Sequence, residues 1–119
     1  MDWKLDKNRP ICPQLCEQFC SQIVSGRFQP GQRLMSVREV AVAAGVNPNT
    51  VQRAFEQLES QGVLYSVRGA GWFVTEDTTA AKHMRNALVQ DKLSVFFEDM
   101  ASLGLSREEV KTIVKEWNQ

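Results

Sequence analysis

The sequence is 119 residues long and contains 14 Lys and Arg, 14 Asp and Glu, one His and three Cys. A chain of this length forms one small domain with a modest extension, and it is too short for a Rossmann fold or a TIM barrel. Its 43% hydrophobic and 24% charged residues are typical of folded soluble proteins rather than of disordered ones. The formal net charge of zero does not exclude nucleic-acid binding, because the total says nothing about where the charges lie.

The N-terminal stretch has mixed charges and no apolar run of signal-peptide length, and nowhere do about 18 apolar residues follow one another. We therefore expect a cytoplasmic protein that does not bind membranes. The odd number of three cysteines fits reduced thiols better than a disulfide framework.

Two helices are expected in the first part of the chain. Apolar residues at helical spacing predict the first helix over residues 13–25, and Gly26 ends it as a typical C-cap residue. Ser36 and Glu39 have the spacing of a capping box and predict a short second helix over residues 37–44.

A third helix is expected over residues 48–61, because Asn47 is a good N-cap and Pro48 suits the first helical position. The period of the apolar pattern then changes. Two runs rich in β-branched and aromatic residues, residues 63–67 and 72–75, flank a glycine-rich tip and predict a β-hairpin.

The C-terminal part reads as helical. From about residue 79 to Gly104, apolar residues recur at intervals of four and three, which is the seam pattern of packed helices. A second capping box at Ser106 begins a final helix with one apolar stripe. We expect these residues to form a dimer interface, although packing against the rest of the same chain is the alternative. The seam and stripe residues are Val89, Leu93, Phe96, Met100, Leu103, Val110, Ile113, Val114 and Trp117.

Helix, short helix, tight turn, helix and hairpin is the order of a winged helix-turn-helix, whose second turn helix enters the DNA major groove. The predicted fold is mainly α with a small β-hairpin wing, followed by a C-terminal helical dimerisation region. We expect residues 1–76 to form the DNA-binding domain and residues 77–119 the dimerisation region.

The motifs PGQRL at residues 30–34, SVRE at 36–39, GVNPNTVQRA at 45–54 and GAGWFV at 69–74 stand in a distinctive order and spacing. Over residues 10–75 the sequence resembles the GntR family of bacterial transcription regulators. The stretch GVNPNTV and the short C-terminal part are most similar to its YtrA-like branch. The resemblance implies a homodimeric DNA-binding protein without catalytic activity.

The start of the third helix also points to DNA by its chemistry. Its polar side chains can donate to phosphate oxygens or read base edges, and a helix N-terminus attracts phosphate. An isolated helix with such a face is more often merely solvated, but the position between a capped short helix and a glycine-tipped hairpin favours DNA contact. These residues are Asn47, Pro48, Asn49, Thr50, Gln52 and Arg53.

Two further sites complete the predicted DNA-binding surface. The resemblance implies that Arg38 lies at the DNA and that Ser36 contacts phosphate, and a nearby anion would offset the unfavourable dipole of the helix start at Arg38. At the wing, Arg68 can meet phosphate or the minor groove, and Gly69 permits close approach of the backbone.

The sequence departs from the family pattern at three positions. Trp72 replaces a residue that is usually small, and we expect its ring to pack on the C-terminal helices, with covering of the sheet and contact with DNA sugars as alternatives. Pro48 and Gln52 stand where the broader family often has arginines, so base recognition here should depend less on arginine.

Cys12, Cys16 and Cys20 lie one helical turn apart, so three thiols cannot close on one metal ion. Ordinary packing is favoured over metal or redox sensing. A thiol enzyme with His83 as the base is a weak alternative, because no orienting acid or oxyanion motif accompanies the pair. No cofactor and no metal are expected.

The predicted function is that of a homodimeric repressor that binds a double-stranded, inverted-repeat operator. A winged domain that binds protein instead of DNA is the alternative. A small-molecule effector is left open: about 40 residues in two helices cannot enclose a large pocket, and a site between subunits is the alternative. The charges that sum to zero are unevenly distributed along the chain. Residues 1–75 carry eight basic and six acidic side chains, and residues 76–119 carry six basic and eight acidic ones. A mildly basic domain is thus followed by a mildly acidic one.

Overall fold

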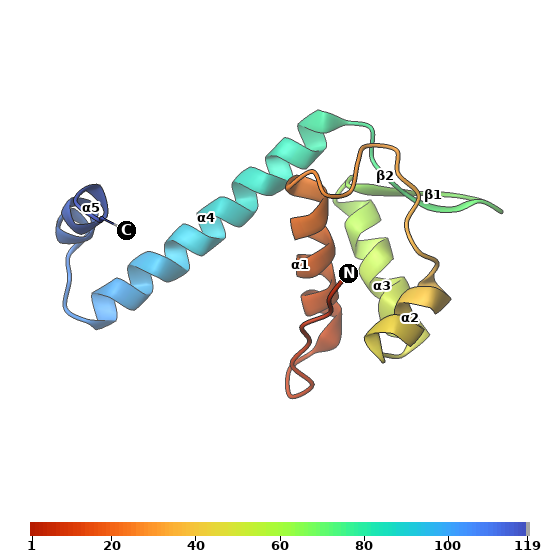
Figure 1. Cartoon of the computed structure of the whole chain (residues 1–119), viewed down its shortest axis with the longest axis horizontal. Helices are drawn as coiled ribbons and strands as arrows, with labels where there is room; N and C mark the ends of the chain where they lie inside the picture. Colours follow the sequence, from red (N-terminus) through yellow and green to blue (C-terminus); the bar gives the residue numbers. More distant parts are fainter. Residues whose placement is uncertain (119) are drawn as a thin grey trace. The chain divides into compact units, whose positions relative to one another are not determined.

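The computed structural model describes residues 1–118, so the last residue of the predicted dimerisation region, Gln119, lies outside the described residues. The fold is mainly helical with a two-stranded hairpin, as expected (Figure 1). Its elements are α1 (Ile11–Val24), α2 (Val37–Ala44), α3 (Pro48–Ser60), β1 (Leu64–Val67), β2 (Gly71–Val74), α4 (Thr78–Ser102) and α5 (Arg107–Lys115).

The chain divides into two compact units, Met1–Arg85 and the residues from Asn86 onward. The division falls inside α4, whereas the functional boundary at residue 76 stays a prediction. No helix in residues 1–118 combines the length and the hydropathy that a membrane span requires.

The predicted helix ends agree with the structure to within about two residues. The one clear difference is α1, which begins at Ile11 rather than at Pro13. Pro10 takes the N-cap position with extended backbone, and Pro13 fits inside the first turn because the N–H that proline lacks has no partner there in any helix.

The core of the first unit is built on Phe55 of α3. Its ring is completely buried and meets Phe19 of α1 edge-on, with 5.1 Å between ring centroids. Trp72 of β2 also meets Phe55 edge-on, with 5.4 Å between the ring centroids. The tryptophan that departs from the family pattern therefore packs on α3, a partner that the sequence did not indicate for it.

The hairpin is joined by a third short stretch that sequence patterning does not predict. Strands β1 and β2 pair antiparallel, with Leu64 opposite Val74. The backbone N–H of Leu34 donates to the Trp72 carbonyl at 2.8 Å, and that of Val74 donates to the Gln32 carbonyl at 2.9 Å. The connection between α1 and α2 thus ties the wing to the helical core.

The second unit has one anchoring side chain. Val110 of α5 is 1% exposed, whereas α4 has no buried residue. The guanidinium of Arg107 lies over the Phe97 ring, 5.0 Å from its centroid. Val110 is thus buried within its own chain, and its assignment to the dimer interface stays a prediction.

The cysteines of α1 are packing residues. Cys16 and Cys20 are buried, and the Cys16 thiol lies 3.6 Å from the Ala54 carbonyl oxygen, to which it donates. Burial raises the pKa of Cys16 to about 12, with the neighbouring Cys12 adding to the shift, and raises the pKa of Cys20 to about 11. Among residues 1–118, no group of three His, Cys, Asp or Glu side chains is placed to hold a metal ion.

These thiols should be unreactive in the folded protein. At about pH 8 we expect Cys16 and Cys20 to resist an aromatic disulfide reagent until denaturant is added, because both are buried and neutral, and nucleophilic attack requires the thiolate. Absorbance of the released thiol, with and without denaturant, measures this. Rapid reaction of all three cysteines in the native protein would contradict it.

The dependence of the core on Phe55 is also measurable. Phe55→Ala should lower the free energy of unfolding by about 3–5 kcal/mol, since it removes a buried ring and leaves a cavity. Tyr65→Ala is the control, because the Tyr65 ring stacks on Phe73 at 5.6 Å but lies at the surface, and its loss should cost about 0.5–1.5 kcal/mol. Urea unfolding curves give the free energy of unfolding of both variants. Equal losses of this free energy would contradict the central role of Phe55 in the core.

Candidate nucleic-acid interface

The turn between α2 and α3 sets the direction of α3. Gly45 caps α2 in the left-handed conformation, with φ 69°, a region that residues with a side chain rarely adopt. The N–H of Val46 donates a hydrogen bond to the Ala41 carbonyl at 3.0 Å. Two residues after the glycine, Asn47 already begins α3, so the two helices are joined by a tight turn.

The first turn of α3 presents polar groups to solvent. The Asn47 side chain accepts a hydrogen bond from the Asn49 N–H at 2.8 Å, and Pro48 follows at the first helical position, as predicted. Asn49, Gln52 and Arg53 are exposed, whereas the Thr50 side chain is half-buried.

The opposite face of α3 is apolar and buried, and its residues are Val51, Ala54, Phe55 and Leu58. Because that stripe packs in the core, rotation of α3 about its axis is fixed. The polar face must therefore point away from the protein, which is the arrangement that a helix needs to enter a groove.

The N-terminus of α2 forms the predicted capping box in full. The Ser36 hydroxyl accepts from the Glu39 N–H at 3.1 Å, and the Glu39 carboxylate accepts from the Ser36 N–H at 3.1 Å. The hydrogen bond from the Ser36 backbone lowers the pKa of Glu39, so the carboxylate of the capping box stays ionised at neutral pH. Arg38 is exposed beside it.

The tip of the hairpin is open. Arg68 and Gly69 are exposed, and no atom lies within 4 Å of the position that a side chain on Gly69 would take. At the base of the tip, the Arg33 guanidinium lies 3.3 Å from where a Cβ on Gly71 would stand. The Arg33 side chain, which comes from the connection between α1 and α2, thus lies beside the wing, a position that sequence reasoning did not predict.

All residues predicted to bind DNA lie in the first unit, and all predicted dimer residues lie in the second. Sequence reasoning missed Lys7, whose Nζ donates to the Gly45 carbonyl of the turn at 2.9 Å although 38 positions separate the two. No local pattern signals such a long-range contact.

The second unit carries an apolar groove of about 670 Å³ between α4 and α5. Trp117 is 68% exposed at its edge, and Ile113 is 51% exposed. The lining residues are Leu93, Phe96, Phe97, Met100, Lys111, Ile113, Val114, Lys115 and Trp117. Apart from Val110, the predicted dimer residues are half-exposed or exposed.

The family model for bacterial regulatory proteins of the gntR family matches residues 14–74. The chain is 33% identical over 119 residues to YhcF of Bacillus subtilis, an uncharacterized HTH-type transcriptional regulator, covering 100% of this chain and 98% of that protein. It is 31% identical to the B. subtilis HTH-type transcriptional repressor YtrA, over 90% of this chain and 83% of YtrA.

Solved structures agree with this assignment. A GntR family transcriptional regulator from Listeria monocytogenes superposes with a TM-score of 0.86 at 34% identity, covering 96% of this chain and 100% of that one. The DNA-binding domain of AraR in complex with operator ORR3 gives a TM-score of 0.53 at 32% identity, covering 63% of this chain and 93% of that one. The chain belongs to the GntR family and is a DNA-binding transcription regulator rather than an enzyme.

Proposed function

We propose that the protein is a cytoplasmic repressor that binds an inverted-repeat operator as a homodimer, with α3 in the major groove and the hairpin beside it. The observation that carries the proposal is the arrangement of α3. Its apolar stripe is buried, and its first turn, which begins at the capped Asn47, presents polar side chains outward.

Within this proposal, base recognition depends on few cations. Gln52 and Asn49 can form paired hydrogen bonds with adenine, and Arg53 can do so with guanine or bind phosphate. Pro48 contributes a fixed backbone and no charge. The positive end of the α3 dipole adds attraction for a phosphate.

The flanking contacts position the helix. Ser36 and Arg38 at the start of α2 are proposed to meet one phosphate, which the dipole of the helix favours and which offsets the cost of a cation there. At the wing, Arg68 and Gly69 approach the sugar-phosphate backbone or the minor groove, which the open tip permits.

A homodimer is proposed through the groove between α4 and α5. Exposed apolar side chains at this density are unfavourable in water, and a second copy of the same surface would cover them. Two linked winged domains would also gain affinity through effective concentration. In this scheme residues 1–76 bind DNA and residues 77–119 hold the dimer, with any effector site between subunits left unassigned.

The name of the related YtrA supports repression, and the AraR complex supports operator binding by this kind of domain. Use of the winged domain for protein binding is disfavoured, because the outward face of α3 is polar. A thiol enzyme is disfavoured because two of the three cysteines are buried.

Substitutions of two arginines test the DNA surface. Arg53→Ala should weaken binding to a duplex enriched from a random pool by about 1–3 kcal/mol if Arg53 reads a base, and Arg38→Ala should lower the salt slope by about one. Fluorescence anisotropy at several salt concentrations measures both. Arg27→Ala, at an exposed arginine beyond the C-terminus of α1, is the control.

The two arginine variants should keep the oligomeric state of the wild type. If both bound the duplex as tightly as the wild type and Arg27→Ala do, with the same salt slope, the proposed surface would be wrong.

The dimer is tested by charge in the groove. Ile113→Glu should convert a dimer to a monomer, because a carboxylate cannot be buried unpaired against an apolar partner. Val95→Glu is the matched control: Val95 is 55% exposed on α4 but does not line the groove. Sedimentation velocity gives the masses, and a monomeric wild type, or a dimer that survives Ile113→Glu, would contradict the proposal.

A further inference from the structure

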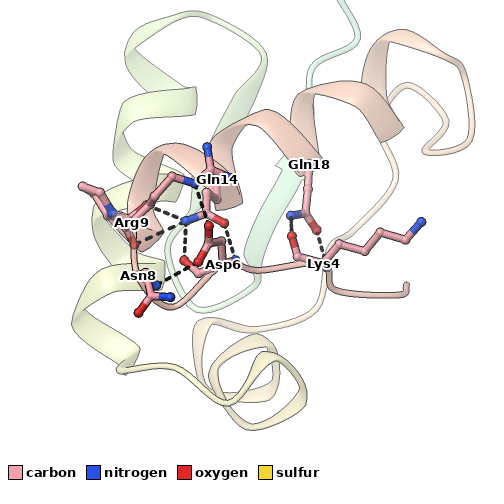
Figure 2. A network of polar contacts seen from close by, with 7 residues as sticks. Lys4, Asp6, Asn8, Arg9, Gln14 and Gln18 are labelled. Carbon is pink, nitrogen blue, oxygen red and sulfur yellow. Dashed lines mark hydrogen bonds and ion pairs between the residues drawn. The ribbon is translucent and has the colours of Figure 1, made fainter.

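The segment before α1 is held against that helix by a pair of glutamines (Figure 2). Gln18 donates to the Lys4 carbonyl at 2.8 Å and accepts from the Lys4 N–H at 3.2 Å. One turn earlier, Gln14 accepts from the Asp6 N–H at 2.7 Å and donates to the Asp6 carbonyl at 2.9 Å. The backbone groups of Lys4 and Asp6 are thus each held to α1 by a pair of hydrogen bonds from one glutamine side chain.

Gln14 also fixes the turn that leads into α1. Its side chain is 8% exposed and donates further to the carbonyl oxygens of Arg9, at 3.3 Å, and Pro10, at 2.9 Å. The Asp6 carboxylate closes the same turn by accepting from the Asn8 N–H at 2.9 Å and from the Arg9 side chain at 3.1 Å (Figure 2). A buried amide with these partners costs more to displace than a surface contact does.

Lys7 stands in this fixed turn and reaches the helix-turn-helix. Its Nζ lies 2.9 Å from the Gly45 carbonyl oxygen, two residues before the N-cap of α3. An ammonium group has three N–H donors, so two remain for another acceptor. The exposed Lys7 charge therefore lies beside the turn from which α3 begins.

We propose that Lys7 binds a backbone phosphate of the DNA and that Gln14 positions it there. The proposal rests on the proposed operator binding and adds a contact outside residues 14–74, the part that matches the family model. A phosphate close to the first turn of α3 would meet both the Lys7 ammonium and the positive end of the helix dipole.

The small basic excess of the first unit makes a single phosphate contact by Lys7 important for DNA affinity. Residues 1–75 carry only eight basic against six acidic side chains, so each additional phosphate contact is a large share of the electrostatic attraction. An exposed cation near a helix C-terminus stabilises the helix by only about 0.3–1 kcal/mol. Capping of α2 by Lys7 alone therefore does not require the buried hydrogen bonds of Gln14.

Lys7→Gln tests the contact, since glutamine keeps an N–H donor but removes the charge. The slope of log K against log salt should fall in magnitude by about 0.9, which corresponds to about fivefold weaker binding at about 0.15 M salt. The loss should be equal on an enriched duplex and on a mixed-sequence duplex, because phosphates carry no sequence. Lys4→Gln, which removes one charge at the Gln18 end of the same segment, should keep the wild-type slope.

Gln14→Leu tests the positioning role. It should reproduce the reduced slope although Lys7 is still present, and adding Lys7→Gln to it should change the slope no further. A cooperative urea unfolding curve for each variant confirms that it is folded. If Gln14→Leu is not folded, Lys7→Gln alone tests the phosphate contact.

A Lys7→Gln slope equal to that of the wild type, while Arg53→Ala still weakens binding, would overturn this inference alone and leave Lys7 as a cap of α2. Equal losses of slope in Lys4→Gln and Lys7→Gln would also overturn it, because the charge would then act without a specific position. A wild-type chain without salt-dependent DNA binding would overturn both this inference and the proposed function.

Discussion

The burial of one face of α3 is the constraint on which the rest of the structure depends. The Phe55 ring contacts both Phe19 and Trp72, with ring centroids 5.1 and 5.4 Å away, so one side chain joins α1, α3 and the hairpin. Once the apolar face of α3 is packed in the core, the opposite, polar face must point to solvent. The position of Gln52 and Arg53 at the surface is therefore a consequence of the core, so the proposed DNA-binding surface and the stability of the domain have the same origin.

The charges explain why such a domain needs help to bind DNA. With a small basic excess in residues 1–75 and a small acidic excess in the rest, the chain has little general attraction for a polyanion. Affinity must then come from placed groups: helix N-termini, a few arginines and the proposed Lys7 contact. Pairing of two chains through the second unit would multiply these modest contributions.

Local chemistry made much of this predictable. The capping boxes at Ser36 and Ser106 formed as their spacing indicates, and α2 has the bounds expected for it, because these signals act within a single turn. Contacts between distant residues were not predictable. The pairing of Leu34 with Trp72, and the bond from Lys7 to Gly45, join segments that no periodicity relates. The apolar stripe that contains Val110 has a related limit: it shows that a face is buried but not by which chain, and Val110 is already buried within its own chain.

The central claim is that α3 of each of two paired chains reads one half of a symmetric site. Selection of DNA from a random pool by the purified full-length chain, followed by sequencing of the bound fragments, tests it most directly. The account predicts enrichment of an inverted repeat whose half-site centres are about 10 base pairs, or a multiple of that, apart. Enrichment of a single asymmetric site, or of no sequence at all, would contradict it.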